Sequence, residues 1–159
     1  MRAEDIMTKD PACCTPNDTA RDAARAMRER DCGCIPVIDP DSEIVIGVVT
    51  DRDLAVRAIA QGKGPDTKLE ELMTPVASCC GPNDDLRAVE RTMSDLQVRR
   101  VPIVDADGCC VGIIAQADIA RAAQHAQVSE HEVAVVIERI SEPASSSGSR
   151  ATESRPSAG

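Results

Sequence analysis

The sequence predicts a mixed α/β (α+β) fold in which two copies of one small unit, each a small sheet with flanking helices, pack with pseudo-twofold symmetry. Short apolar runs bounded by turn residues alternate with stretches whose apolar residues recur at helical spacing. The same order of runs occurs twice along the 159 residues. Because a unit of about 60 residues is marginally stable by itself, we expect the copies to pack sheet to sheet around one shared core.

The first copy begins with a helical turn, a strand and a helix. The turn covers residues 4–8, and the strand covers residues 11–16 between two prolines. Asn17 and Asp18 are cap candidates for the helix, which runs to about Arg30. Its apolar residues lie on one helical face, at Ala20, Ala23, Ala24 and Met27.

A β-hairpin and a second helix complete this copy. Strands at residues 34–39 and 44–50 flank a turn at residues 40–42. A helix at about residues 52–60 follows, and two glycines and a proline at residues 62–65 end it.

The pattern then begins again. Met73 follows Met7 by 66 residues, whereas Asp118 follows Asp53 by 65. The first hairpin turn therefore holds one extra residue, an insertion that turns tolerate.

These intervals set the domain boundaries. Residues 1–65 form the first copy and residues 66–127 the second. Residues 128–140 are expected to form a C-terminal helix that begins with a capping box, Ser-Glu-His-Glu. Residues 141–159 are rich in Ser, Pro, Gly and Ala without periodicity, which predicts a disordered tail.

Composition excludes several classes of partner. The chain has no Phe, Tyr or Trp and a net charge of −9, which argues against nucleic-acid binding by stacking or by phosphate contacts. No apolar run is long enough to span a membrane. The N-terminus lacks the apolar core of a signal peptide, so we expect a cytoplasmic location with mostly reduced cysteines.

Thr50 and Asp53 flank the junction between a strand and a helix. The free N–H groups of a starting helix and a hydroxyl suit a phosphate, and a carboxylate can accept hydrogen bonds from a sugar diol. The local alternative is that Asp53 only caps the helix or interacts with its dipole.

Three motifs resemble those of a known family. Residues 35–39 (Ile-Pro-Val-Ile-Asp) and 101–105 (Val-Pro-Ile-Val-Asp) are similar to each other, and residues 47–54 carry a Gly-x-x-Thr-x-x-Asp signature. Together they resemble a tandem CBS-domain pair, or Bateman module, over about residues 2–122. The resemblance is to small bacterial proteins that consist of one such pair and act in stress responses such as hypoxia.

The resemblance implies a non-catalytic regulatory sensor that binds AMP, ADP, ATP or S-adenosylmethionine between the repeats, with no required cofactor. It places Asp53 on the ribose hydroxyls and Thr50 on phosphate. By position, the base would be framed by Cys14, Thr15, Ile35 and Pro36. It also implies a phosphate contact from Arg100, with Arg99 a weaker candidate.

The family commonly forms homodimers through its helices. Here the apolar faces of residues 55–59 and 119–123 are the candidate contact surface, and an unidentified protein target would read the signal. In the second signature Ala115 takes the place of Thr50, while Asp118 is kept. We therefore expect the site at Thr50 and Asp53 to be the stronger one.

The eight cysteines support an alternative, a redox- or metal-responsive protein that does not bind nucleotides. The pairs at residues 13–14 and 79–80 are related by the repeat and could approach each other across the pseudo-twofold axis. Spacing typical of zinc knuckles is absent, so no metal ligands are predicted. The other interpretation is that the cysteines are small buried hydrophobic residues. His125 and His131 are expected to be solvated, and no catalytic constellation is present.

Overall fold

The computed structural model describes residues 1–76, 78–125, 134–135, 137–138 and 141. The capping box at residues 129–132 and residues 142–159 of the expected tail lie outside the described residues, and only parts of the predicted C-terminal helix lie within them. The side-chain amide of Gln116 donates to the carbonyl oxygen of Ile137 at 3.2 Å, which places Ile137 beside the start of the last helix of the second copy.

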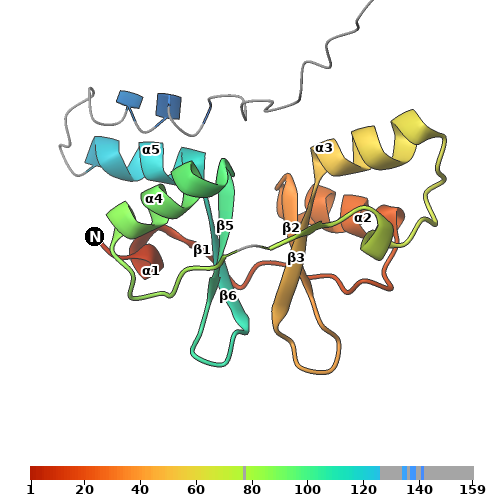
Figure 1. The fold of residues 1–159 in the computed structure, drawn as a ribbon, viewed down its shortest axis with the longest axis horizontal. Helices are drawn as coiled ribbons and strands as arrows, with labels where there is room; N and C mark the ends of the chain where they lie inside the picture. Colours follow the sequence, from red (N-terminus) through yellow and green to blue (C-terminus); the bar gives the residue numbers. More distant parts are fainter. Residues whose placement is uncertain (77, 126–133, 136, 139–140, 142–159) are drawn as a thin grey trace, which may run out of the picture.

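Two three-stranded antiparallel sheets stand side by side, each with helices packed on it (Figure 1). The first sheet contains β2 (Cys34–Ile38), β3 (Val45–Thr50) and β4 (Thr74–Pro75). The second contains β1 (Thr8–Lys9), β6 (Cys110–Ala115) and β5 (Arg100–Val104). The mixed fold predicted from the sequence is confirmed.

The helices follow the predicted order. The first copy carries α1 (Ala3–Ile6), α2 (Ala20–Arg30) and α3 (Asp51–Asp53), the last continuing through a π-helical turn at Leu54–Ala58 and a 3₁₀ turn at Ile59–Gln61. The second copy carries a 3₁₀ turn at Leu69–Glu71, α4 (Leu86–Leu96) and α5 (Gln116–His125). Among the described residues, no helix is long and apolar enough to cross a membrane.

The copies exchange their first strands. β1 of the first copy pairs with β6 of the second, and β4 of the second copy pairs with β3 of the first. The registers are equivalent, since Thr8 lies opposite Ile113 as Thr74 lies opposite Val48. The hairpin tips also meet, where Val45 N donates to the carbonyl oxygen of Gly108 at 3.2 Å. Each half therefore needs the other to complete its sheet.

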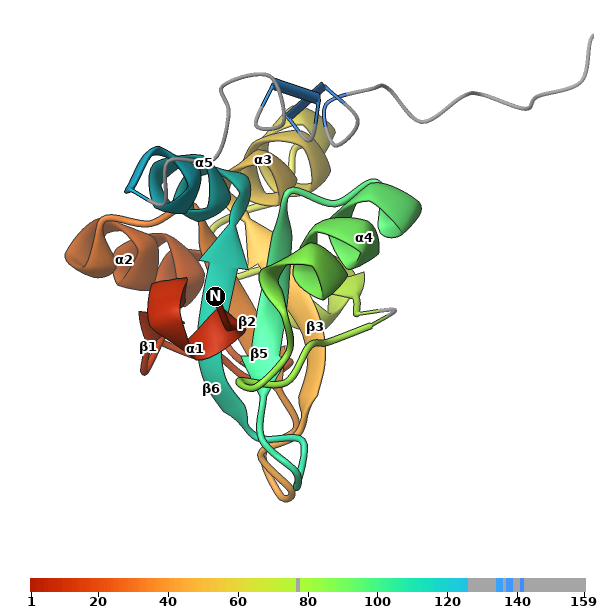
Figure 2. The same ribbon diagram turned by 90° about the vertical axis from the view of Figure 1, so that its left-hand side faces the viewer.

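The exchange produces two buried clusters, where we predicted one shared core. The first cluster, around β2 and β3, includes Leu69 and Leu72 from the second copy, both fully buried. The second cluster, around β5 and β6, includes the fully buried Ala3 from the first copy. Its helix, α1, lies against this sheet (Figure 2). Two separate clusters form because each sheet is covered by its own helices and by the segment received from the other copy.

Several local predictions were wrong. Residues 11–16 form no strand; only Cys14 makes a bridge, to Val37, because prolines cannot donate ladder hydrogen bonds. The cap of α2 is Thr19, whose hydroxyl accepts from Asp22 N. Asp18 instead accepts from Thr15 N at 2.6 Å, which closes a separate turn.

The apolar faces behave differently from the prediction in two places. Ala24 of α2 is exposed, although Ala23 on the same helix is fully buried. Of the candidate dimer surface, Val56 and Ile59 are exposed, whereas Ile119 and Ala123 are buried and cannot offer contact area without rearrangement.

Candidate ligand-binding site

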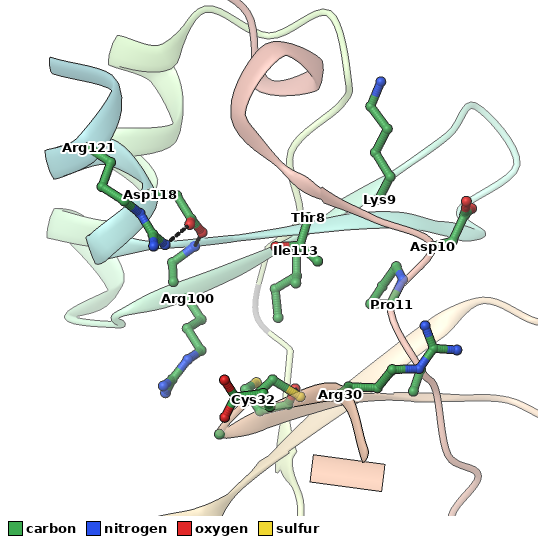
Figure 3. A pocket seen from close by; sticks show the side chains of 15 residues that line it. Thr8, Lys9, Asp10, Pro11, Arg30, Cys32, Arg100, Ile113, Asp118 and Arg121 are labelled. Atoms are coloured by element: carbon green, nitrogen blue, oxygen red, sulfur yellow. Dashed lines mark hydrogen bonds and ion pairs between the residues drawn. The ribbon is translucent and has the colours of Figure 1, made fainter. Parts of the chain in front are cut away.

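A cavity of about 370 Å³ lies where the two copies meet. Residues 8–12 and 30–34 of the first copy form one side (Figure 3). The second copy contributes the other side with Arg100, Ile113, Ala115, Asp118 and Arg121. The strand exchange explains this composition, because β1 carries residues 8–12 onto β6.

Asp118 is held at the end of β6 by the start of α5. Its Oδ2 accepts from the backbone N–H of Ala115 at 2.7 Å, and its Oδ1 pairs with Nη2 of Arg121 at 2.6 Å. The Asp118 side chain is 15% exposed, whereas that of Arg121 is 70% exposed. An ion pair to so exposed a guanidinium is weak, so a ligand can displace Arg121 at little cost.

Four basic residues line the cavity in a chain whose net charge is −9. The four are Lys9, Arg30, Arg100 and Arg121, against the acidic Asp10, Asp31 and Asp118. The net charge of the residues that line the cavity is therefore slightly positive, which favours an anionic group on the ligand.

Arg100 is the basic residue with the clearest role. Within the part of the chain that the structure describes, its guanidinium makes no hydrogen bond or ion pair. A Cβ at Gly33 would lie 3.3 Å from Nη2 of Arg100 and 2.7 Å from Oδ2 of Asp51. Glycine at this position therefore lets the guanidinium of one copy lie against the backbone of the other.

The first signature forms a closed capping box. Oδ2 of Asp53 accepts from the backbone N–H and from the hydroxyl of Thr50, each at 2.9 Å, and Asp53 N donates back to that hydroxyl at 3.1 Å. Nε of Arg57 lies 3.5 Å from Oδ1 of Asp53. The cap considered from the sequence is thus present, and it uses the polar atoms that we assigned to a ligand.

The predicted site residues fall into two groups. Arg100 and Asp118 line the cavity described above, and the other six do not. Those six gather around β2 and β3: Cys14 N donates to the carbonyl oxygen of Pro36 at 3.0 Å, and Ile35 lies opposite Val49, next to Thr50. Thr15 is half-buried, and Ile35 and Pro36 are buried.

Sequence reasoning missed most of the cavity wall. Residues 8–12 and 30–33 were assigned no ligand role, and Arg121 was not considered. The one usable signal was Gly33, a glycine directly before a buried strand, which often marks a close approach of two backbones.

Interpreting the cysteines as small buried residues is correct for three of the eight; the other five are half-buried or exposed. Cys14, Cys34 and Cys80 are buried, and burial raises the pKa of Cys14 to about 11 and that of Cys34 to about 12. The nearby Arg100 opposes the rise at Cys34. All eight cysteines are free, and the described residues hold no group of three His, Cys, Asp or Glu side chains placed to bind a metal ion.

Two α+β units that exchange strands and enclose a cavity at their junction define a tandem-repeat module. The sequence matches the CBS domain twice, over residues 3–58 and 69–125. The chain belongs to the CBS-domain family, which confirms the resemblance drawn from the motifs.

Relatives place the chain among CBS pairs. It is 32% identical to Hypoxic response protein 1 of Mycobacterium tuberculosis over 142 residues, 89% of this chain and 94% of the relative. A crystal structure of Hypoxic Response Protein I with two coordinated zinc ions is similar, with a TM-score of 0.67 and 34% identity, covering 76% of this chain and 98% of the other.

Two solved CBS structures contain adenosine compounds. The CBS pair of protein MJ0100, in complex with 5′-methylthioadenosine and S-adenosyl-L-methionine, has a TM-score of 0.71 and 26% identity. CBSX2, in complex with AMP, has a TM-score of 0.67 and 28% identity. Each alignment covers 79% of this chain and 98% of the other.

Proposed function

We propose that this chain is a non-catalytic regulatory module that binds an adenosine-type ligand (AMP, ADP, ATP or S-adenosylmethionine) in the cavity between its two CBS copies. The observation that carries the proposal is the guanidinium of Arg100, which lies in a cavity lined by both copies and makes no hydrogen bond or ion pair within the described residues. The adenosine compounds bound by MJ0100 and CBSX2 support the ligand class.

The lining residues suit the parts of a nucleotide. Asp118 would accept hydrogen bonds from the ribose diol, with its Arg121 partner displaced toward solvent. Arg100 would contact phosphate, in place of the hydroxyl that Ala115 lacks. The base would lie against apolar side chains, because the chain has no aromatic residue on which it could stack. A volume of about 370 Å³ is within the usual range of small-molecule sites.

The site at Thr50 and Asp53 is proposed as a second, separate position. A ligand there would have to open the capping box that now occupies the Thr50 hydroxyl and Oδ2 of Asp53. This cost reverses the order of preference that the sequence suggested, and it makes the cavity at Asp118 the first site to test.

Binding would be read out by a partner protein. A ligand that touches both copies favours one relative placement of the two sheets, and a partner that binds this placement better would sense the ligand. The chain is proposed to form a homodimer, with the exposed Val56 and Ile59 as the contact surface. Sedimentation of the wild type and of Ile59→Asp tests this, since only the wild type should be dimeric.

Isothermal titration of the four ligands tests the function. Asp118→Asn is expected to weaken binding about 10–100-fold, the value of a hydrogen bond to a charged acceptor, and Asp53→Asn is the matched control. Arg100→Gln should weaken AMP, ADP and ATP but leave S-adenosylmethionine nearly unchanged, because that ligand has no phosphate.

The outcomes separate the alternatives. No heat with any of the four ligands would overturn the function. Loss of binding in Asp53→Asn but not in Asp118→Asn would keep the function and move the ligand to the first signature.

A further inference from the structure

The N-terminal strap, residues 8–13, crosses from the first copy onto the second. Lys9 lies opposite Gly112 in the ladder between β1 and β6, and Asp10 N donates to the carbonyl oxygen of Val111 at 3.3 Å. Pro11 has no N–H to continue this ladder. The strap therefore leaves β6 at the level of Cys110.

Two thiols meet where the strap leaves the sheet. Sγ of Cys13 turns back to the carbonyl oxygen of Pro11 at 3.5 Å, and Sγ of Cys110 points to the carbonyl oxygen of Gly112 at 3.5 Å. The thiols are also close enough for each to shift the pKa of the other. The register of β1 and β6 continues with Pro11 opposite Cys110, and Cys13 follows two residues later with its Sγ turned back toward Pro11, so the two thiols lie at the same level of the sheet.

Cys13 and Cys110 are more accessible than the buried members of the cysteine pairs. Cys13 and Cys110 are half-buried, so an oxidant can reach them, whereas Cys14 and Cys80 are buried in the two separate clusters. From the sequence we considered an approach of the pairs at residues 13–14 and 79–80. The thiol that contacts Cys13 is instead Cys110.

We propose that Cys13 and Cys110 form a reversible disulfide that ties the N-terminal strap to β6. The oxidant is a peroxide. The Cys13 thiolate attacks one peroxide oxygen, the O–O bond breaks, and a sulfenic acid forms at Cys13 with release of hydroxide. The Cys110 sulfur then attacks the Cys13 sulfur, the S–O bond breaks, and one water leaves as the disulfide forms.

The interaction between the two thiols assigns their roles. It lowers the pKa of Cys13, because the Cys110 thiol can donate to the Cys13 thiolate and so stabilises it. The same interaction and burial raise the pKa of Cys110. Cys13 is therefore the thiol that meets the oxidant, and Cys110 is the thiol that resolves the sulfenic acid.

The disulfide has a consequence for the cavity. Residues 8–12 of the strap line it, so a bond at residue 13 restrains one of its walls. This consequence rests on the proposed ligand site, whereas formation of the bond itself does not. The two are therefore tested by separate measurements.

Peptide mapping of the full-length protein tests the bond. Reduced protein is treated with one equivalent of hydrogen peroxide and digested without reductant. We expect a loss of two hydrogens and one cross-linked pair of tryptic peptides, residues 10–21 with residues 101–121. Because Cys14 and Cys109 lie in the same two peptides, the serine variants assign the bond: Cys13→Ser and Cys110→Ser lose it, and Cys109→Ser keeps it.

Thermal unfolding gives a second, independent measurement. The bond would close a loop of nearly 100 residues, so the oxidised wild type should melt about 5–10 °C higher than the reduced protein. Neither Cys13→Ser nor Cys110→Ser should show this rise. Cys79 is the rival, since it lies close enough to Cys110 to raise its pKa. A bond between Cys79 and Cys110, or no cross-link at all, would overturn the proposal whether or not a nucleotide binds.

Discussion

Replacing Ala115 by Thr should stabilise the protein by about 1 kcal/mol. In the first copy the Thr50 hydroxyl donates to Oδ2 of Asp53 at 2.9 Å and accepts from Asp53 N at 3.1 Å. In the second copy only the backbone bond from Ala115 N to Asp118, at 2.7 Å, is present. Thr at position 115 can make both missing bonds, because the side chain faces an open cavity.

Urea unfolding measures this gain. With a slope of about 2 kcal/mol per M, the midpoint should rise by about 0.5 M in Ala115→Thr. Thr50→Ala is the matched control and should lower it by a similar amount. If Ala115→Thr is no more stable than the wild type while Thr50→Ala is destabilised, the two junctions are not equivalent and the reasoning is refuted.

Ala115→Thr also distinguishes two roles for the hydroxyl that it introduces. If the hydroxyl completes the capping box, AMP affinity should change by less than about threefold, because both hydrogen-bonding directions are already used. A larger gain would mean that the hydroxyl turns to phosphate, the role that family resemblance gave to Thr50.

Two further predictions concern stability. Leu72→Ala should lower the free energy of unfolding by about 2–5 kcal/mol, because this fully buried residue of the second copy fills the first cluster. The control Leu96→Ala, at a partly exposed position, should lower it by less than about 1 kcal/mol. Equal losses in urea unfolding would contradict the strand exchange. Hydrogen bonds from Thr19 lower the pKa of Asp22 in the folded state. The stabilisation that Asp22 provides is therefore present above the pKa of the unfolded state and is lost as pH falls through the pKa of the folded state. Wild type and Asp22→Asn should differ in urea midpoint at pH 7 and converge near about pH 2.

The central hairpins could be predicted because their signal is local. Strands expected at residues 34–39 and 44–50 are found at Cys34–Ile38 and Val45–Thr50, and the turn between them is marked by Pro, Asp and Ser. The repeat carried this success over to the second copy. Runs of β-branched residues can be recognised in the sequence itself, whichever residues they pack against in the fold.

The strand exchange could not be predicted for the opposite reason. β1 has two residues, Thr8 and Lys9, both exposed, so it leaves no hydrophobic pattern. Its partner, β6, is about a hundred residues away in the sequence. A prediction that keeps each copy separate assigns residues 8–12 to the wrong half and therefore misses one wall of the cavity.

The candidate site was predictable only in part, since its residues come from both copies. Asp118 was found because the signature and the repeat fix its position, and Arg100 was found because the family resemblance implies an arginine two residues before Pro102. From the sequence we favoured the first signature over the second. The sequence shows that Thr50 carries a hydroxyl, but it does not show that this hydroxyl is already bonded to Asp53. Ala115, which we expected to weaken its site, instead lines the open cavity beside a carboxylate held by fewer bonds.

The N-terminal strap would couple ligand binding to thiol oxidation, and such a coupling is thermodynamically reciprocal. The strap forms one wall of the cavity and carries one of the two thiols. If the disulfide changes ligand affinity by some factor, the ligand must change the equilibrium of thiol oxidation by the same factor. A tenfold effect corresponds to a shift of about 30 mV in the reduction potential of the Cys13–Cys110 pair, which is measurable by titration against a thiol–disulfide buffer with and without AMP. Because the shift requires both the disulfide and a bound ligand, its presence would link redox state to nucleotide binding, whereas an unchanged potential with AMP bound would show that the strap transmits nothing between them.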